Sequence, residues 1–308
     1  MMGGTLKERL RRIAQQWRDY PLREGTVIAD KYRVERFLGM GSYGQAYAAM
    51  HRDSGAKVLV KVSKPSKGET ARTLLRRESD IMRALDHPQI PRWLDYKEER
   101  RRSVLVMELV RGANLETRMM EEGAVYDELA AARTLRELLA PLEHLHAHGF
   151  VHRDVRIPNV LECKGTDAEE AVIYLIDFGL ACRIGERLPE SLRQALGEED
   201  GDRAGSDGDW GGVKRRMRRP EPGSDLYGAG HFALFLLYSG YAPQDEADDG
   251  DWRSELALSE PMRGWIERAL GEQRPFRDAL ECAAELDAVI EALSTGTAGR
   301  GPKPDHDS

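Results

Sequence analysis

A glycine-rich run flanked by two predicted strands constrains the fold of this chain more than any other feature. Residues 32–38 and 45–50 have the pattern of strands, and Gly39-Met40-Gly41-Ser42-Tyr43-Gly44 joins them. In a dinucleotide-binding fold such a run opens a helix instead. A hairpin of this kind lets backbone N–H groups approach phosphate oxygens. The run therefore predicts a lid over a nucleotide or, taken alone, an ordinary flexible hairpin.

A lysine inside the next predicted strand favours the nucleotide interpretation. Lys61 lies in the apolar stretch 58–62, where an amine needs anionic partners to offset the loss of water. Phosphate and a carboxylate are the expected partners. The candidate carboxylate is Glu78, which lies in a predicted amphipathic helix over 69–85 that ends at His87-Pro88.

The overall composition narrows the class of protein. The chain has 308 residues, a formal net charge of −7 and three cysteines without C-x-x-C spacing. Neither a disulfide framework nor a zinc site is indicated, and the charge balance argues against nucleic acid or an anionic membrane as a partner. The longest apolar run, residues 232–238, is far shorter than the roughly 18 to 20 residues that cross a bilayer. We therefore predict a soluble, cytoplasmic protein with no nucleic-acid and no membrane partner.

The two ends of the chain are predicted to lie outside the main domain. Residues 1–28 form an amphipathic extension, in which apolar side chains recur at helical spacing, and we expect it to dock on the chain's own domain. It does not have the pattern of a signal peptide, because no uninterrupted apolar stretch follows the basic residues. Residues 294–308, rich in glycine, proline and charge, are predicted to be a disordered tail.

Two further motifs follow in order, and with them the chain resembles the protein kinase family. His152-Arg153-Asp154-Val155-Arg156-Ile157-Pro158-Asn159 is similar to the catalytic loop H-R-D-x-x-x-x-N, and Asp177-Phe178-Gly179 is similar to D-F-G. The glycine-rich run resembles the family's phosphate loop, residues 58–61 resemble V-A-I-K, and Glu78 resembles the glutamate of helix C. Motifs in this order, each on the expected element, are hard to reach by chance.

The resemblance implies an α+β, two-lobed fold. We expect a kinase domain over 29–293, with a β-rich N-lobe at 29–107, a hinge at 108–113 and a mainly helical C-lobe at 114–293. A leucine stripe over 135–145 predicts the central helix of the C-lobe. His144, His146 and His148 are predicted to be an exposed helix end rather than a metal site. Asp225 is expected to brace the catalytic loop.

The resemblance also implies ATP and Mg²⁺ as cofactors and assigns roles to residues. Lys61 would hold the α and β phosphates, Glu78 would orient Lys61, and Asp154 would accept the proton of the substrate hydroxyl. Asn159 and Asp177 would coordinate magnesium. The residues expected to contact the nucleotide are Leu38, Gly39, Gly41, Gly44, Ala46, Leu59, Lys61, Met107, Glu108, Val110 and Leu161.

Four positions depart from the family pattern or qualify it. Ala46 and Leu59 exchange a larger and a smaller side chain, which predicts a reshaped but functional adenine pocket. Arg156 stands where Ser/Thr kinases commonly have lysine, and we expect it to contact the γ-phosphate or the substrate hydroxyl. Arg153 marks a site in which an arginine beside the base can pair with a phosphorylated residue.

The segment between Gly179 and Pro220 matches the family least. An acidic, glycine-rich stretch at 198–212 precedes the basic run Lys214–Arg219, and we predict a mobile loop in which the basic run is solvated and balances the acidic stretch. Pro220-Glu221 is the only trace of A-P-E, with Arg274 as the expected partner of Glu221. Ser191 and Ser206 are the hydroxyl residues of the segment, and phosphorylation of Ser206 is a hypothesis.

The resemblance predicts a Mg²⁺- and ATP-dependent Ser/Thr protein kinase of bacterial type. Its partners would be protein substrates, with phosphorylation of its own chain among the expected reactions. Two alternatives stay open. One is a kinase of small molecules, of the aminoglycoside or choline type, against which Arg153 argues. The other is a pseudokinase scaffold, which the irregular segment before Pro220 favours.

Overall fold

The computed structural model describes residues 19–164, 171–198, 208–241 and 251–296 of the chain. Backbone contacts divide the chain into two compact units, which we call the sheet unit and the helical unit. The sheet unit contains the described residues of 1–86, 91–110 and 188–200, and the helical unit contains those of 87–90, 111–187 and 201–308. A β-rich unit and a mainly helical unit make up the α+β class that the sequence predicts.

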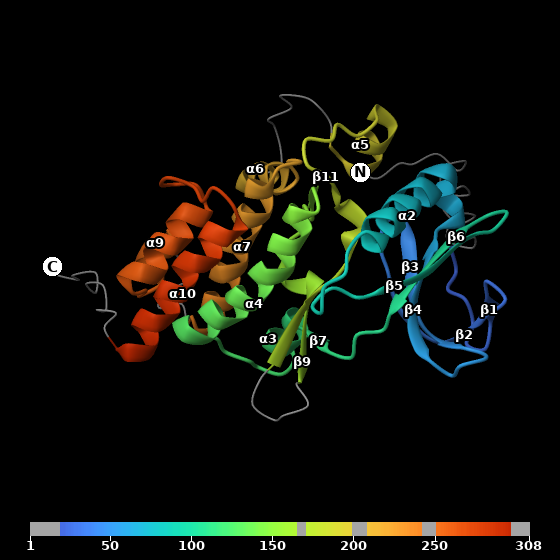
Figure 1. The fold of residues 1–308 in the computed structure, drawn as a ribbon, viewed down its shortest axis with the longest axis horizontal. Helices are drawn as coiled ribbons and strands as arrows, with labels where there is room; N and C mark the ends of the chain where they lie inside the picture. Colours follow the sequence, from blue (N-terminus) through green and yellow to red (C-terminus); the bar gives the residue numbers. More distant parts are fainter. Residues whose placement is uncertain (1–18, 165–170, 199–207, 242–250, 297–308) are drawn as a thin grey trace, which may run out of the picture. The chain divides into compact units, whose positions relative to one another are not determined.

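Antiparallel strands form the sheet of the sheet unit (Figure 1). They are neighbours in the order β1-β2-β3-β4-β6-β5. The turn between the second and third strands contains the glycine-rich run, which confirms the predicted strand–loop–strand setting. The strands are β1 Val27–Ile28, β2 Tyr32–Met40, β3 Gly44–His51, β4 Lys57–Ser63, β5 Trp93–Glu98 and β6 Ser103–Glu108.

Alternation along β4 assigns its side chains to two faces. Val58, Val60 and Val62 are at most 3% exposed and belong to an apolar core that also contains residues of β1, β2, β3 and β6. Leu59 and Lys61 lie between these valines, so they belong to the opposite face. Helix α2 (Gly68–Arg83) packs on that opposite face, and it ends ahead of His87-Pro88 as predicted.

Helix α4 (Glu128–Ala147) is the central helix of the helical unit. The leucines at 135, 138, 139, 142 and 145 have no exposed area, which confirms the predicted stripe. Asp127 caps the helix, because its carboxylate accepts the N–H of Ala130 at 2.8 Å. The other elements are the helices α3 Leu115–Met120, α6 Gly208–Met217, α7 Pro222–Leu237, α8 Trp252–Glu255, α9 Glu260–Ala269 and α10 Ala279–Thr295, the strands β7 Ala113–Asn114, β8 Phe150–Val151, β9 Val160–Lys164, β10 Ala171–Leu175 and β11 Cys182–Arg183, and short 3-10 turns at Ile157–Asn159, Phe178–Leu180 and Tyr238–Gly240.

Residues 87–90 belong to the helical unit, although the sequence analysis includes them in the N-lobe. Gln89 explains this placement. Its side-chain amide donates to the backbone carbonyl oxygens of Glu137 at 3.1 Å and Ile173 at 3.0 Å. Its backbone carbonyl accepts the N–H of Leu175 at 2.9 Å. Three hydrogen bonds of a largely buried residue therefore fix this turn to α4 and β10.

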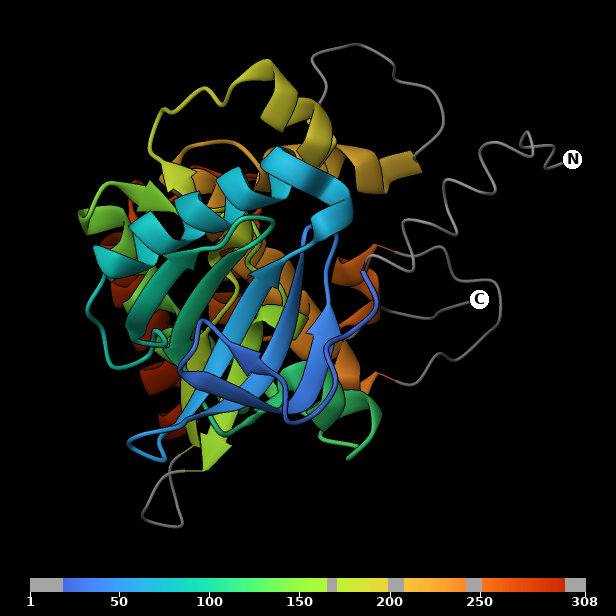
Figure 2. The ribbon, with the colours of Figure 1, turned by 90° about the vertical axis from the view of Figure 1, so that its right-hand side faces the viewer.

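The predicted mobile loop covers the acidic stretch 198–212 and the basic run Lys214–Arg219, and helix α6 shows that this prediction is wrong over 208–217. Residues Glu190–Leu196 form helix α5 and residues Gly208–Met217 form helix α6, while 199–207 lie outside the described residues. Helix α5 belongs to the sheet unit, where it lies beside α2 (Figures 1 and 2). No element is predicted from the sequence at 190–196, because contacts with residues distant in sequence stabilise α5, and local composition does not reveal such contacts.

The ends of the chain are described in part. The predicted apolar stripe of the N-terminal extension and residues 297–308 of the predicted tail lie outside the described residues. Helix α10 continues to Thr295, so the tail cannot begin at 294 as predicted. Near the other end, Asp19 accepts the N–H of Ser66 at 3.0 Å, and Leu22 packs against the core of the sheet unit.

Cys163, Cys182 and Cys282, which all lie in described ranges, are not joined by disulfide bonds. Within the described residues, no helix combines the length and the apolar character that spanning a bilayer requires.

Candidate active site

The glycine-rich run covers the end of β2, the turn that follows and the first residue of β3. The N–H of Gly41 donates to the carbonyl of Gly44 at 2.9 Å. A Cβ on Gly39 would meet nothing within 4 Å, and a Cβ on Gly41 or Gly44 would meet no atom nearer than 3.5 Å. None of the three has a positive φ. Because the chain's own packing does not require glycine here, these positions fit a ligand that approaches the backbone closely.

Lys61 and Glu78 form the ion pair that the sequence predicts. The Nζ atom of Lys61 lies 2.5 Å from the Oε1 atom of Glu78, and the two side chains are 19% and 5% exposed. Strand β4 supplies the amine, and helix α2 supplies the carboxylate from its buried face. Each charge offsets the desolvation cost of burying the other, so the pair fixes α2 against the sheet.

Three of the residues predicted to contact the nucleotide, Ala46, Leu59 and Met107, lie on the same face of the sheet as Lys61. In the strand ladder Ala46 is opposite Lys61, while Leu59 is opposite Ala48 on one side and Met107 on the other. Because the small Ala48 flanks it, the larger Leu59 fits without crowding. Leu38, next to Gly39 on β2, is 38% exposed.

The predicted hinge begins at the end of β6. Glu108 exchanges two hydrogen bonds with Arg92, since its N–H donates to the carbonyl of Arg92 at 2.9 Å and its carboxylate accepts the N–H of Arg92 at 3.3 Å. The boundary between the two units falls after Val110. Gly112 follows in the helical unit, where a Cβ would lie 2.6 Å from the carbonyl oxygen of Glu162. Glycine is therefore required there by packing and not for a ligand.

The catalytic-loop motif brings Asp154, Arg156 and Asn159 together. The Oδ2 atom of Asp154 accepts the side-chain amide of Asn159 at 2.7 Å and the Nε–H of Arg156 at 3.1 Å. The same amide of Asn159 donates to the carbonyl of Asp154 at 3.0 Å. In the described part of the chain no hydrogen bond reaches the other oxygen of Asp154, Oδ1, and the side chain is 22% exposed. The carboxylate is thus oriented through one oxygen, and the second can accept a proton.

Asp225 of α7 braces this loop from below, as predicted. Its carboxylate accepts the backbone N–H groups of His152 at 2.8 Å and Arg153 at 2.7 Å, and it has no exposed area. The Nε2 atom of His146 lies 2.8 Å from the same carboxylate. Burial by itself would raise the pKa of Asp225, yet the hydrogen bond and charge of His146, with His152, hold that pKa below its usual value. The carboxylate therefore stays ionised inside the protein.

The prediction of an exposed helix end is wrong for His146. Its side chain is 9% exposed and belongs to the bracing network around Asp225. His144 and His148 stack on each other, with ring centroids 4.1 Å apart. Among the described residues, no group of three or more His, Cys, Asp or Glu side chains is arranged to hold a metal ion.

The Asp177-Phe178-Gly179 motif follows strand β10. Phe178 is buried against the ring of His152, with centroids 5.0 Å apart in an edge-to-face arrangement. This contact leaves the neighbouring Asp177 exposed, with a left-handed backbone of φ 65°. Leu161, the predicted floor of the adenine site, is opposite Tyr174 on β10 and Asn114 on β7. The motif and the predicted floor thus belong to one small sheet, β10-β9-β7, and its flanking turn.

Asn159 and Asp177 suit a magnesium ion by their chemistry. Mg²⁺ prefers carboxylate and amide oxygens, and it is commonly held by one or two carboxylates together with phosphate oxygens and water. The amide nitrogen of Asn159 donates to Asp154, which orients its carbonyl oxygen as the remaining group. Asp177 adds an exposed carboxylate. A pair of oxygen donors without a complete protein cage fits Mg²⁺ that arrives with a nucleotide.

Arg153 is bonded to the main chain. It is 4% exposed, its Nε–H donates to the carbonyl of Arg218 at 2.6 Å, and its Nη1–H donates to the carbonyl of Leu180 at 3.2 Å. These bonds tie the catalytic loop to both ends of the segment between Gly179 and Pro220. The basic run is thus more than a solvated stretch, because Arg216 also lies over the ring of Tyr227 at 4.1 Å.

Glu221 does not form the ion pair with Arg274 that the sequence predicts. Its carboxylate lies 3.6 Å from Arg219, and the carbonyl of Arg274 accepts the Nε–H of Arg268 at 2.9 Å. Glu221 directly precedes α7, whose first residue is Pro222. The nearest cation in sequence therefore pairs with Glu221 in place of a distant one.

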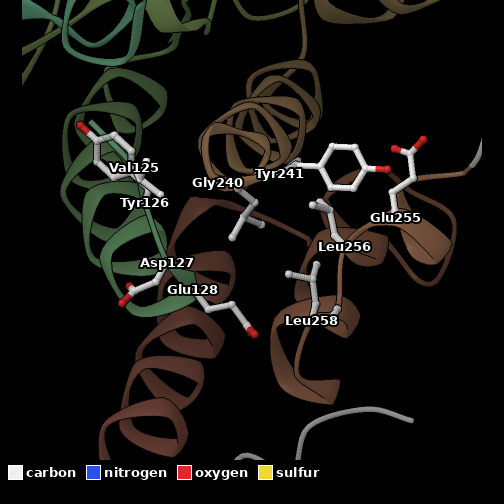
Figure 3. A pocket seen from close by; sticks show the side chains of 11 residues that line it. Val125, Tyr126, Asp127, Glu128, Gly240, Tyr241, Glu255, Leu256 and Leu258 are labelled. Carbon is white, nitrogen blue, oxygen red and sulfur yellow. The ribbon is translucent and has the colours of Figure 1, made fainter. Parts of the chain in front are cut away.

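A pocket of about 440 Å³ in the helical unit contains none of the predicted site residues (Figure 3). It is lined by Val125–Glu128, by Leu237, Gly240 and Tyr241, and by residues 255–258. Two of its carboxylates already have structural partners. Glu128 accepts the N–H and hydroxyl of Ser259, which caps α9, and Glu255 accepts the hydroxyl of Tyr238. These acidic groups hold loops and a helix end in place.

Comparisons with known proteins agree with the geometry of the site. A model of the protein kinase domain matches residues 32–197. A probable serine/threonine-protein kinase of Bacillus subtilis, YbdM, is 26% identical over 278 residues, which cover 90% of this chain and 96% of the relative. Serine/threonine-protein kinase B of Synechocystis is also 26% identical, over 89% of this chain, but the chain spans only 51% of that protein. A probable myosin light chain kinase of Dictyostelium discoideum is 32% identical over 58% of this chain and 45% of its own length.

Solved kinase structures have the same fold. The kinase domain of PknI from Mycobacterium tuberculosis superposes with a TM-score of 0.61 at 21% identity, over 87% of this chain and 99% of that one. The apo form of PpkA-294 superposes with a TM-score of 0.62 at 16% identity, over 86% and 99% of the two chains. Because the family model matches more than half of the sequence and the motifs lie on the expected elements, this chain belongs to the protein kinase family.

Proposed function

We propose that this protein transfers the γ-phosphate of ATP to serine and threonine hydroxyls of proteins, with Mg²⁺. The observation that carries the proposal is the arrangement at Asp154. One carboxylate oxygen is held by Asn159 and Arg156, and the other is available to a substrate hydroxyl. Phosphoryl transfer depends mainly on alignment and charge neutralisation, so an acceptor oriented by such a carboxylate is the central requirement.

The sheet unit supplies the groups that would bind the phosphates. In the proposal Lys61 neutralises the α and β phosphates, and Glu78 holds the lysine in position through the ion pair. The backbone of Gly39, Gly41 and Gly44 covers the phosphates, which fits the open space around these glycines. Adenine is held by the face that carries Ala46, Leu59 and Met107, and Leu38, Glu108 and Val110 are the further predicted contacts of this unit. Leu161, a residue of the helical unit, stays a predicted contact.

The helical unit supplies the groups that would act on the transferred phosphate. Magnesium, when bound, would neutralise charge on the phosphate oxygens, and Asn159 and Asp177 would hold it. Asp154 would accept a hydrogen bond from the attacking hydroxyl and take its proton as the bond to phosphorus forms. Aspartate is a weak base, so its larger contribution is the orientation of the hydroxyl.

Protein acceptors of the Ser/Thr type are proposed from the relatives. YbdM and the Synechocystis kinase are both named serine/threonine-protein kinases. The matches of this chain to the protein kinase model and to YbdM do not favour the two alternatives, a pseudokinase scaffold and a kinase of small molecules. Phosphorylation of the chain itself belongs to the proposal, and the cytoplasmic location stays a prediction.

Labelling with Mg·[γ-³²P]ATP tests the proposal. We expect the purified full chain to label itself and generic protein substrates, and we expect phosphoserine and phosphothreonine after acid hydrolysis of the product. EDTA should abolish the label, as should Lys61→Met and Asp154→Asn. Faster labelling of a panel of small alcohols, or binding of Mg·ATP with no transfer to any acceptor, would contradict the proposal.

Arg156→Ala is expected to lower kcat roughly tenfold, because a hydrogen bond to a charged group is lost at Asp154. Arg156→Lys should recover part of the loss, since lysine keeps the charge but not the planar fork. Steady-state phosphorylation at saturating Mg·ATP measures both variants. Arg133→Ala, an exposed position on α4, is the control that should match the wild type. Unchanged kcat and KM in Arg156→Ala would remove this residue from the proposed site.

A further inference from the structure

Helix α5 packs against helix α2 in the sheet unit. Leu188 and Leu192 are each 6% exposed and form an apolar cluster with Leu74 of α2, which is 7% exposed. Leu196 and Tyr43 pack against the same cluster. We call these five residues the α5 clamp. This cluster shares no residue with the core of the sheet. It forms where the segment after Asp177-Phe178-Gly179 packs against α2.

Tyr43 connects the clamp to the glycine-rich run. Its hydroxyl donates to the carbonyl of Ala195, near the C-terminal end of α5, and the Nζ of Lys67 lies 5.5 Å from the centre of its ring. The carbonyl of Tyr43 accepts the N–H of Lys64 at 2.8 Å. The aromatic residue of the phosphate loop is therefore held both by its side chain and by its backbone.

The clamp also contacts the part of α2 that positions Glu78. Leu74 precedes Glu78 by four residues, so the two side chains lie on one face of the helix. Leu74 faces α5, and Glu78 pairs with Lys61. Through this one helix face, α5 supports the ion pair as well as the loop.

The other end of the same segment is held without a phosphate group. Arg153, the arginine expected to bind a phosphorylated residue, donates instead to the carbonyls of Leu180 and Arg218. Between residues 180 and 220 the chain has only two hydroxyl side chains, Ser191 and Ser206. Ser191 is exposed on α5 and points away from the buried leucines.

We infer that the α5 clamp positions the phosphate loop and helix α2 for nucleotide binding, and that it does so without phosphorylation of the segment. Tyr43, Leu188, Leu192 and Leu196 are thus positioning residues that act through the glycine-rich run and through Glu78. The inference rests on the proposed function, since the geometry that the clamp holds is the proposed phosphate site. It predicts that nucleotide binding does not depend on phosphorylation of Ser206, a residue outside the described ranges.

Two clamp variants and one matched control test the inference. Tyr43→Phe removes only the hydroxyl, and we expect it to raise the Kd for Mg·ADP and the KM for ATP roughly fivefold, the effect of one hydrogen bond. Leu192→Ala removes a buried side chain, and we expect roughly a tenfold or larger rise in both constants. Ser191→Ala, on the exposed face of the same helix, should stay within about twofold of the wild type because surface changes have small effects.

Hydrogen exchange separates positioning from general destabilisation. In Leu192→Ala the amides of 68–83 and of 39–44 should exchange faster, while those of α4 should keep the wild-type rate. Tyr43→Phe keeps the partly buried ring and removes only the hydroxyl, so its melting temperature should fall by only about 2–4 °C. It therefore keeps the test valid even if Leu192→Ala folds poorly.

Dependence on phosphate is tested with Ser191→Ala/Ser206→Ala and with phosphatase-treated wild type, both of which should keep full activity. Loss of activity in either sample would overturn the inference, as would wild-type Mg·ADP affinity in both clamp variants. Higher activity in the clamp variants would also overturn it and would indicate an inhibitory strap. If the wild type transfers no phosphate, the proposed function fails, but Mg·ADP binding and hydrogen exchange still decide whether the clamp positions the nucleotide site.

Discussion

Asp154→Asn is expected to lower kcat for protein phosphorylation by about 10²- to 10⁴-fold, the usual contribution of a positioned acid or base. Asparagine has nearly the same shape, and its side-chain oxygen can still accept the amide of Asn159 and the guanidinium of Arg156. The negative charge is lost, however, and so is a group able to take the proton of the substrate hydroxyl. Initial rates at saturating Mg·ATP and protein substrate measure the effect.

The pattern of constants distinguishes catalysis from binding in this variant. The Kd for Mg·ADP should change little, because Lys61, Glu78 and the glycine-rich run are unaltered. Asp53→Asn, in the exposed turn between β3 and β4, is a matched control that should leave both kcat and Kd at wild-type values. A kcat within threefold of the wild type would exclude Asp154 as the residue that orients the hydroxyl.

Asp225→Ala is expected to lower the free energy of unfolding by about 3–5 kcal/mol, the range found when one partner of a buried charged network is removed. The substitution leaves the N–H groups of His152 and Arg153 buried without an acceptor, and it separates His146 from its partner. Urea unfolding followed by circular dichroism measures the loss. Asp127→Ala removes an exposed helix cap from the same unit and should lower the free energy of unfolding by only about 1 kcal/mol.

The same carboxylate predicts a dependence of stability on pH. Because the pKa of Asp225 is lower in the folded protein than in the unfolded chain, its ionised form stabilises the fold above the ordinary aspartate pKa of about 4. That contribution should be lost as the pH falls through the lower, folded-state pKa. As the pH is lowered from 7 to 3, the free energy of unfolding should therefore fall more steeply for the wild type than for Asp225→Asn. Parallel curves for the two proteins would show that Asp225 does not carry this dependence.

The sequence was sufficient to predict the elements that short motifs and periodicity define. The glycine-rich hairpin, the valine-lined strand around Lys61 and the leucine stripe of α4 are local patterns, because a single strand or helix turns each pattern into one buried face. The Lys61–Glu78 pair and the bracing by Asp225 could also be predicted. Lys61 places a charge in an apolar strand, where anionic partners offset its burial, whereas the brace by Asp225 is implied by the resemblance to the kinase family.

Only the tertiary structure decided the contacts of residues whose own sequence neighbourhood is uninformative. Helix α5 has a polar composition, and it exists because Leu188 and Leu192 find Leu74 more than a hundred positions earlier in the chain. His146 has the local pattern of an exposed helix end, yet it is buried against Asp225, and Arg153 bonds to carbonyl groups that no side-chain motif records. Such contacts depend on which backbone segments meet, and their free energy comes from burial and hydrogen bonding between segments that local sequence patterns do not connect.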